Sequence, residues 1–381
     1  MKFEHYISVG RERLRCGYTT GTCAAAAARG AAELLLTGTM PDTVTIATPS
    51  GMVVETELTD PARGQGWASC AVRKDAGDDP DVTNSALIYA RVELSEDTGI
   101  LIDGGEGVGR VTRPGLDQPV GHAAINSVPR KMIEQQALAA LTASGKSCGL
   151  RVIISMPDGL HLAAKTFNPR LGIEGGVSIL GTSGIVRPMS ETALMDSLFL
   201  SLDMLYAAGF RDVIMTPGNY GNHFCTEVLG LPEDCRVSCS NYFGACVDHA
   251  AGIGIDSILL VSHVGKLIKV AAGSMNTHSR TADGRREVLT AHTAICGGTQ
   301  ELCRKIFDCS TADEALALLE NENMQESVMD SVTEALEQQL KYRAGESLRL
   351  EAIMFSNKFG ILGKTKGAQE LMQAHIERMN T

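Results

Sequence analysis

The sequence predicts an α+β domain with a mostly antiparallel sheet over residues 1–185, followed by an α/β domain with a parallel, Rossmann-like sheet over residues 186–381. In the first part, short strand-like segments follow one another between turns rich in Gly, Pro and Asp, and one clear helical segment interrupts them. In the second part, strand-like and helical segments alternate, which is typical of a parallel sheet covered by helices on both faces. The length of 381 residues also favours two domains, since about 150 residues per domain is usual.

In the first part, a helix is expected at residues 19–36, where a threonine at position 19, 20 or 22 can cap a run rich in Ala and Leu. The alanines from Ala24 to Ala28 let this helix lie unusually close to a sheet or to a ligand, and both interpretations stay open. The other expected elements are strands at residues 43–49, 52–58, 86–94, 151–157 and 162–167, and a helix at residues 129–145.

The second part begins with an amphipathic helix at residues 190–209, which ends at Gly209 as a helix with a glycine C-cap would. Strand and helix then alternate, with three helical segments before the last strand. The expected strands are residues 212–217, 235–240, 256–262 and 348–356, and the expected helices between them include residues 244–252 and 265–273.

Composition excludes several classes of protein. The net charge of −11 and the aromatic content of 4% argue against a general nucleic-acid binder, which needs a positive surface and stacking side chains. No apolar run approaches the about 20 residues that span a bilayer, and the first residues lack the apolar segment of a secretory signal. The 11 scattered cysteines favour reduced thiols. We therefore expect a cytoplasmic protein without nucleic-acid or membrane partners, with a homo-oligomer left open.

Two segments raise the question of a metal. Cysteines gather at residues 225–246 and 296–309, but no neighbouring pair has the two-residue spacing of a zinc or iron–sulfur knuckle, so buried free thiols are the favoured interpretation. Four carboxylates between Asp75 and Asp81 could hold Mg²⁺, or they could cap backbone N–H groups and pair with nearby cations. The second interpretation is favoured, and no metal site is expected.

Polar turns follow the strands expected in the second part, and ligands of open parallel sheets bind beyond the carboxyl ends of the strands. Gly lets backbone N–H groups approach a ligand, while Asn and Ser can hold ribose hydroxyls, although these residues also simply close tight turns. No GxGxxG fingerprint follows a strand and no GxxxxGK[ST] motif occurs, which argues against dinucleotide oxidoreductases and nucleotide hydrolases. The residues expected to bind a nucleoside-sized ligand are Gly218, Asn219, Ser240, Asn241, His263, Gly265 and Lys266.

The chain contains a series of long motifs over most of residues 13–290. They are GYTTGTCAAAAA, VRKDAGDDPDVT, GGEGVGRVTRPGL, GHAAINSVPRKMI, KTFNPRLGIEGGVSILGTSGIVRPMS, TPGN, SHVGKLIKVAAGSMNTHS and ADGRRE. In this order they resemble the cobalt-precorrin-5B C-1 methyltransferase family. Ser262 stands where the family often has Gly, and Gly284 stands where Ala is common. The resemblance fades beyond about residue 290.

The resemblance implies transfer of a methyl group from S-adenosylmethionine to ring carbon 1 of cobalt-precorrin-5B, giving cobalt-precorrin-6A in anaerobic cobalamin biosynthesis. The methyl donor is then a co-substrate bound by the α/β domain, and the cobalt is carried by the substrate alone. Displacement from a sulfonium needs alignment of the reactants and no side-chain nucleophile. No catalytic residue is therefore assigned, and His263 and Lys266 are the weak candidates.

The implied corrin substrate is anionic, because it bears several acetate and propionate carboxylates, which pair best with Arg and Lys. A chain of net charge −11 needs a locally basic cleft to hold it. We expect that cleft between the domains, joined by a Gly-rich stretch at residues 165–190. Its expected residues are Arg73, Lys74, Arg130, Lys165, Arg170 and, from the second part, Lys266.

Two other hypotheses stay open at this point. A non-catalytic corrinoid-binding protein would hold cobalt through a histidine, although a lone histidine is more often structural. A small-molecule oxidoreductase would use the same α/β domain, against which the missing glycine fingerprint counts. The histidines that could serve as cobalt ligands are His122, His223, His263 and His278.

Overall fold

The computed structural model describes residues 3–166, 168–169 and 171–379 of the chain. The chain divides into two compact units, Met1–Glu191 and Thr192–Thr381, each of which is described by itself below. We call them unit 1 and unit 2. The boundary expected from the sequence, between residues 185 and 186, lies a few residues before this division.

Unit 1 is built on a five-stranded sheet with the order β6-β7-β8-β11-β9. All neighbours in it are antiparallel except β11 and β9, so the prediction of a mostly antiparallel sheet is confirmed. Along β8, Ala90 and Val92 are buried while Arg91 between them is partly exposed, the alternation of a sheet with one covered face. The bounds are β6 Thr59–Gly64, β7 Trp67–Arg73, β8 Leu87–Ser95, β9 Ile100–Gly104 and β11 Gly149–Ser155.

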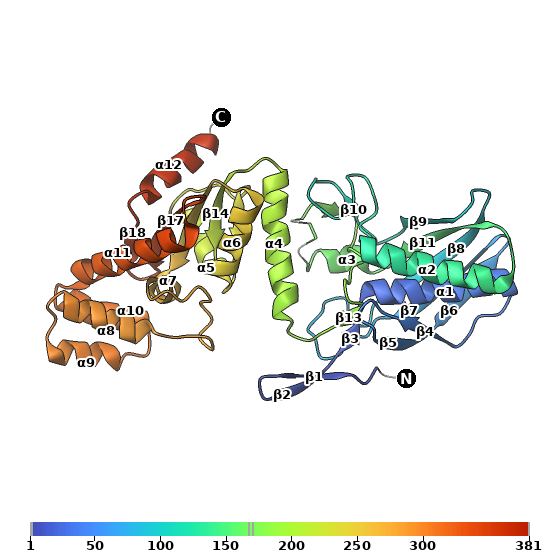
Figure 1. Ribbon diagram of the computed structural model, residues 1–381, viewed down its shortest axis with the longest axis horizontal. Coiled ribbons are helices and arrows are strands. Elements are labelled where there is room, and N and C mark those ends of the chain that lie inside the picture. The colour runs from blue at the N-terminus through green and yellow to red at the C-terminus, as the bar shows by residue number, and fades with distance from the viewer. Residues whose placement is uncertain (1–2, 167, 170, 380–381) are drawn as a thin grey trace. The chain divides into compact units, whose positions relative to one another are not determined.

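Helices α1 (Thr20–Thr37) and α2 (Ser127–Ser144) lie side by side over the sheet of unit 1 (Figure 1). Helix α1 begins where the hydroxyl of Thr19 accepts a hydrogen bond from the N–H of Thr22 at 3.2 Å. Its alanines from Ala24 to Ala28 are fully buried, and a Cβ at Gly30 would come within 2.2 Å of a methyl group of Leu58. The small residues of α1 thus serve close packing on the sheet of unit 1.

Shorter elements complete unit 1. The prediction of a strand at residues 162–167 is wrong for the residues that the structure describes. Leu162 and Ala163 belong to helix α3 (Gly159–Ala163), and a turn follows them. Residue 167 lies outside the described residues. A short apolar run does not distinguish helix from strand. Four antiparallel pairs are β1 Tyr6–Val9 with β2 Glu12–Arg15, β3 Gly17–Tyr18 with β13 Ile185–Val186, β4 Thr43–Ala47 with β5 Val53–Glu57, and β10 Arg110–Val111 with β12 Ile173–Glu174.

Unit 2 is built on a second five-stranded sheet with the order β15-β14-β16-β17-β18. The first four strands of this order are parallel, as predicted, and the unpredicted strand β18 adds an antiparallel edge. The residues of β16 from Ser257 to Ser262 are all buried, as expected for a central strand covered on both faces. The bounds are β14 Asp212–Thr216, β15 Arg236–Ser238, β16 Ser257–His263, β17 Arg349–Ser356 and β18 Gly360–Lys364.

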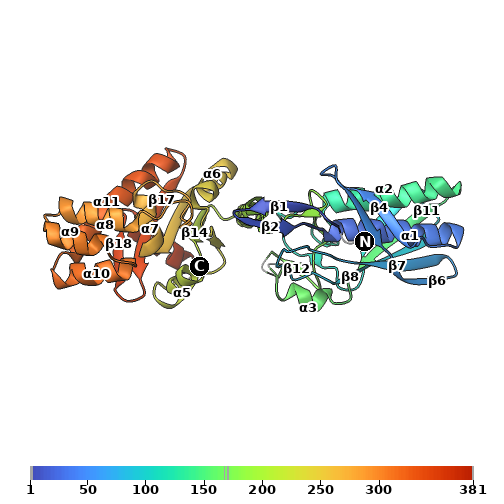
Figure 2. The same cartoon turned by 90° about the horizontal axis from the view of Figure 1, so that it is seen from below.

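Helices cover both faces of this sheet. On β14, Met215 packs into a core with α6, α7 and α11, while its neighbour Ile214 packs into a second core with α5 and α12. Figure 2 shows α5 and α6 on opposite sides of β14. The helices are α4 Glu191–Ala207, α5 Asn219–Glu227, α6 Phe243–Ile253, α7 Val264–Ala271, α8 Arg285–Ile295, α9 Gln300–Phe307, α10 Ala312–Asn321, α11 Gln325–Ala344 and α12 Ala368–Met379. In the described part of the chain, none of the helices has the length and apolar character needed to cross a membrane.

Candidate functional site

The carboxyl ends of four parallel strands meet at one edge of the sheet of unit 2. Strands β14, β15, β16 and β17 end at Thr216, Ser238, His263 and Ser356, and each is followed by a polar turn or by the first turn of a helix. We call this edge, with residues 217–222, 239–241, 263–266 and 356–357, the polar rim. The sequence-based expectation that these turns share one edge is met by the strand order.

Lys266, in the first turn of α7, connects two turns of the polar rim. Its ammonium donates hydrogen bonds to Oδ1 of Asn241 at 2.6 Å and to the carbonyl of Ser240 at 3.4 Å. Asn241 is also bonded to Thr277, whose N–H donates to its carbonyl at 2.9 Å and whose hydroxyl donates to Oδ1 at 3.3 Å. Burial lowers the pKa of Lys266. The side chains of Lys266 and Asn241 are therefore held in one fixed arrangement.

His263 caps helix α7. Its Nδ1 accepts a hydrogen bond from the N–H of Gly265 at 3.2 Å, so the proton of the neutral ring lies on Nε2, which faces Oδ2 of Asp313 at 4.0 Å. Asp313 in turn accepts a hydrogen bond from the hydroxyl of Ser356 at 2.8 Å. Burial lowers the pKa of His263, and the charge of Asp313 opposes this shift. Nδ1 is occupied by the helix cap, and Nε2 has Asp313 as a charged neighbour at a distance too long for a hydrogen bond, so the geometry supports a capping role for His263.

The turn after β14 brings glycine and an aromatic ring to the polar rim. Gly218 precedes α5, and a Cβ at Gly221 would come within 2.9 Å of the carbonyl of Val261, so Gly221 lets α5 approach the strands. Asn219 is exposed beside Tyr220, whose side chain is 70% exposed and whose ring centroid lies 6.5 Å from that of His263. Tyr220 is not among the residues predicted from the sequence; the signal for it is an aromatic residue shortly after a strand end.

The acidic turn from Asp75 to Asp81 is held by contacts within unit 1. Asp75 accepts two hydrogen bonds from the guanidinium of Arg15, at 2.6 and 2.7 Å. The ammonium of Lys74 lies 2.5 Å from Oδ2 of Asp81. Although burial alone would raise the pKa of Asp81, Lys74 and the hydrogen bonds from Thr83 lower it. These contacts fit the structural interpretation of the turn, and among the described residues no cluster of metal-ligating side chains occurs.

The basic residues expected to bind the substrate have different environments. Lys74 is 2% exposed and paired with Asp81, so its ammonium lies inside unit 1. Arg130 donates hydrogen bonds to three backbone carbonyls, at distances of 2.9 to 3.3 Å, and burial lowers its pKa. Arg73 and Lys165 are exposed. Arg170 lies outside the described residues.

A hollow of about 720 Å³ in unit 1 lies beside Arg130. Its lining includes Arg110, Arg151 and His122. The two arginines are not among the substrate-binding residues predicted from the sequence. Arg110 pairs with Asp103 at 2.9 Å. Arg110 and His122 lie in two of the family motifs quoted above, GGEGVGRVTRPGL and GHAAINSVPRKMI. Their place in these motifs is the sequence feature that indicates a functional role.

The cysteines are free thiols, as predicted. Cys225, Cys235, Cys239 and Cys246 are buried in the cores of unit 2, where burial raises the pKa of Cys225 and of Cys246 to about 12. The three cysteines after residue 290 are partly buried. Thiols with raised pKa values are poor nucleophiles and poor metal ligands near neutral pH, so Cys225 and Cys246 are not suited to a reactive site.

Fold and site together define a two-unit α/β protein whose second unit has a mostly parallel sheet with polar residues at the strand ends. Comparison with known families narrows this class. The CbiD family model matches residues 7–188, and the model described as CbiD, C-terminal domain, matches residues 276–366. The chain belongs to the CbiD family, which confirms the family resemblance found in the sequence.

Curated relatives match over nearly the whole chain. The cobalt-precorrin-5B C(1)-methyltransferase of Ruminiclostridium cellulolyticum is 46% identical, over 93% of this chain and 92% of the relative. The enzyme of the same name from Alkaliphilus metalliredigens is 42% identical, over 97% of both chains. The crystal structure of the cobalamin biosynthesis protein CbiD from Archaeoglobus fulgidus is 30% identical, with a TM-score of 0.40, over 74% of this chain and 87% of that chain.

Proposed function

We propose that this chain is a cytoplasmic enzyme that transfers a methyl group from S-adenosylmethionine to ring carbon 1 of cobalt-precorrin-5B, giving cobalt-precorrin-6A. The observation that carries the proposal is the 46% identity to a curated cobalt-precorrin-5B C(1)-methyltransferase over 93% of this chain. The free, mostly buried thiols support a reducing compartment.

The polar rim of unit 2, as a Rossmann-like edge, is the proposed site for the methyl donor. Ser240, Asn219 and the N–H groups at the start of α5 and α7 offer the donors and acceptors that ribose hydroxyls and an amino-acid end require. The ammonium of Lys266 lies at the same edge and favours a carboxylate nearby. When bound, S-adenosylmethionine supplies an electrophilic methyl group.

The remaining task of the protein is alignment. Displacement from a sulfonium is an in-line reaction, and holding the ring carbon and the methyl group in line can supply several kcal/mol of the barrier. The substrate carbon is itself the nucleophile, so no side chain has to attack. This fits a rim whose His263 caps a helix and whose Lys266 is bonded to Asn241.

The proposed corrin site uses basic residues of unit 1. Of the residues expected from the sequence, Arg73 and Lys165 are exposed and accessible to a carboxylate, and Arg170 is proposed on the sequence motif alone. Lys74 is buried and paired with Asp81, and three of the five N–H donors of Arg130 are bonded to backbone carbonyls, so in this proposal these two residues shape the surface more than they bind the ligand.

Turnover with a labelled methyl donor tests the proposed function. Purified protein, cobalt-precorrin-5B and S-adenosylmethionine labelled in its methyl group are incubated together, and the label in the corrin is counted against released S-adenosylhomocysteine. Equal amounts of both products are expected. Binding of the corrin without incorporated label would indicate the alternative, a non-catalytic corrinoid-binding protein.

Salt should weaken corrin binding selectively. The Michaelis constant for the corrin is expected to rise about tenfold between roughly 0.05 and 0.3 M salt, because screening acts on the multiply charged substrate. The affinity for S-adenosylhomocysteine should hardly change. Lys165→Ala and Arg170→Ala should mimic the rise, whereas Lys305→Ala, at an exposed position, should not. A salt-independent Michaelis constant would remove these residues from the proposed site.

A further inference from the structure

The segment between α7 and α8 is part of a motif that the proposed function leaves without a role. It runs from Ser274 to Asp283, between Gly273 and Gly284, whose φ angles of 84° and 60° are in the left-handed region. Such angles favour glycine, and they let the chain turn sharply at both ends of the segment. We call residues 274–283 the α7–α8 loop.

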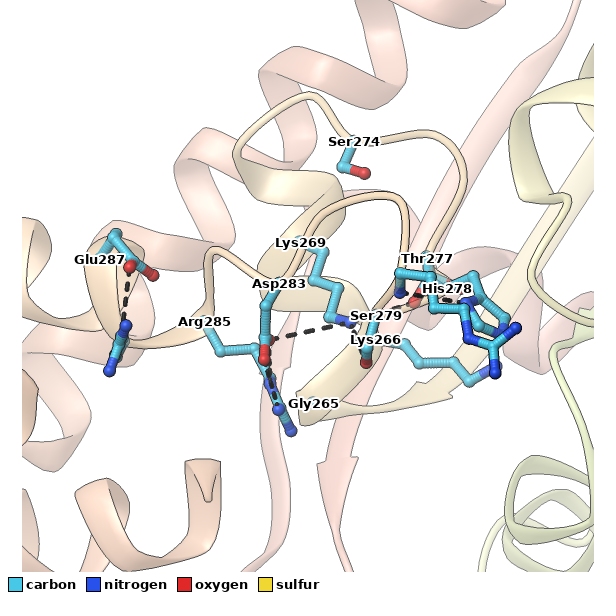
Figure 3. Close-up of polar contacts among 12 residues, drawn as sticks. Gly265, Lys266, Lys269, Ser274, Thr277, His278, Ser279, Asp283, Arg285 and Glu287 are labelled. Atoms are coloured by element: carbon cyan, nitrogen blue, oxygen red, sulfur yellow. Dashed lines mark hydrogen bonds and ion pairs between the residues drawn. The ribbon is translucent and has the colours of Figure 1, made fainter. Parts of the chain in front are cut away.

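The ammonium of a buried lysine is directed at this loop. Lys269 lies one helical turn after Lys266 on α7 and is 2% exposed. Its Nζ donates hydrogen bonds to the carbonyl of Thr277 at 3.1 Å and to the hydroxyl of Ser279 at 3.0 Å, and it lies 3.9 Å from Oδ1 of Asp283. Figure 3 shows these three partners around Lys269. Every one of them belongs to the α7–α8 loop.

Burying an ammonium group costs free energy, because the charge loses its hydration. Burial lowers the pKa of Lys269, and the charge of Asp283 opposes this shift. A methionine of similar length would fill the same volume without the loss of hydration that a charge undergoes. What the ammonium adds is a fixed position for the loop.

The loop is also attached to the polar rim. Thr277 is bonded to Asn241 through both its N–H and its hydroxyl. The N–H of Gly244, in the first turn of α6, donates to the carbonyl of Met275 at 3.0 Å, and a Cβ on Gly244 would come within 2.6 Å of the Met275 side chain. The α7–α8 loop therefore lies against the turn after β15. Lys269 donates to the carbonyl of Thr277, and the N–H and hydroxyl of the same residue donate to Asn241.

We propose that Lys269 is a positioning residue of the methyl-donor site, which fixes the α7–α8 loop against the polar rim and thereby sets the orientation of Asn241 and Lys266. This inference rests on the proposed function, because it assumes that the donor binds at the polar rim. Lys269 acts through Thr277 and need not touch the donor itself. A loop that moved away would release Asn241 from Thr277 and leave Lys266 with a mobile partner.

Lys269→Met is the test. Calorimetry should show affinity for S-adenosylhomocysteine about tenfold weaker, because binding of the ligand then has to order the released loop. Hydrogen exchange should become faster at the amides of Thr277 to Asp283. The Michaelis constant for the donor should rise more than kcat falls. Lys305→Met is the matched control, because Lys305 is an exposed lysine on α9 that pairs with Glu301, and it should change none of these quantities.

Two further variants make the outcome decisive. Ser279→Ala removes one acceptor of Lys269 and should weaken donor binding in the same direction by a smaller factor, even where Lys269→Met does not fold. Lys269→Arg keeps a cationic donor and should restore part of the affinity. Wild-type protein that does not bind S-adenosylhomocysteine would contradict the proposed function itself. Wild-type affinity and unchanged loop exchange in the folded Lys269 and Ser279 variants would overturn this inference alone.

Discussion

Asn241→Ala is expected to weaken binding of S-adenosylhomocysteine by about 30- to 100-fold. The substitution removes the oxygen that accepts hydrogen bonds from Lys266 at 2.6 Å and from Thr277 at 3.3 Å. Asn241 is proposed to contact the donor, and its loss also leaves Lys266 without a fixed position; together these changes are expected to cost about 2–3 kcal/mol of binding free energy, which corresponds to this factor in affinity. Titration calorimetry on the purified variant measures the effect.

Asn321→Ala is the matched control, because Asn321 is an exposed asparagine at the end of α10. It should bind S-adenosylhomocysteine as the wild type does. Circular dichroism establishes that both variants are folded. Unchanged affinity in folded Asn241→Ala would mean that the methyl donor does not bind at the polar rim.

Gly30→Val is expected to destabilise unit 1 by about 3 kcal/mol. Even a Cβ at this position of α1 would lie 2.2 Å from a methyl group of Leu58 and 3.1 Å from the sulfur of Cys70, so the buried Leu58 side chain or the helix has to shift within a packed core. Trp67 is the single tryptophan of the chain and lies on β7 of unit 1. Its fluorescence during urea unfolding therefore reports on this unit.

Gly252→Ala is the control, because it adds a side chain at a glycine where there is room for one. Gly252 lies within α6 of unit 2, and a Cβ there has no described heavy atom within 4 Å. Alanine should favour the helix by up to about 1 kcal/mol and leave the Trp67 transition unchanged. A Gly30→Val protein with a wild-type Trp67 transition would contradict the close packing of α1.

Much of the fold could be predicted because local patterns decide it. The Ala-rich run after Thr19 has few conformations other than helix, and the buried run from Ser257 to Ser262 fits only a covered strand once helices flank it. What local patterns do not contain is the partner of a short strand. Gly17 and Tyr18 pair with Val186 and Ile185, although most of the sequence of unit 1 lies between them. A strand of two residues is too short to show a periodic pattern from which this pairing could be predicted.

In the candidate site, too, some features could be predicted from local patterns and others could not. Alternation of strands and helices predicts that polar turns share one sheet edge, and the strand order agrees. The partners of individual side chains depend on tertiary contacts. Lys74 and Arg130 resemble surface cations in the sequence, yet Asp81 and three backbone carbonyls engage them. Lys269, within an apolar helix, gives no sign in the sequence that its ammonium binds the α7–α8 loop.

The position of the transferred methyl group tests the central claim most directly. Wild-type protein is incubated with cobalt-precorrin-5B and S-adenosylmethionine carrying a ¹³C-labelled methyl group, and the corrin product is examined by NMR. We expect one enriched methyl resonance, coupled to ring carbon 1, and a strongly reduced yield with Asn241→Ala. An unlabelled corrin, or a label on another ring carbon, would contradict the assignment of this chain as the C-1 methyltransferase.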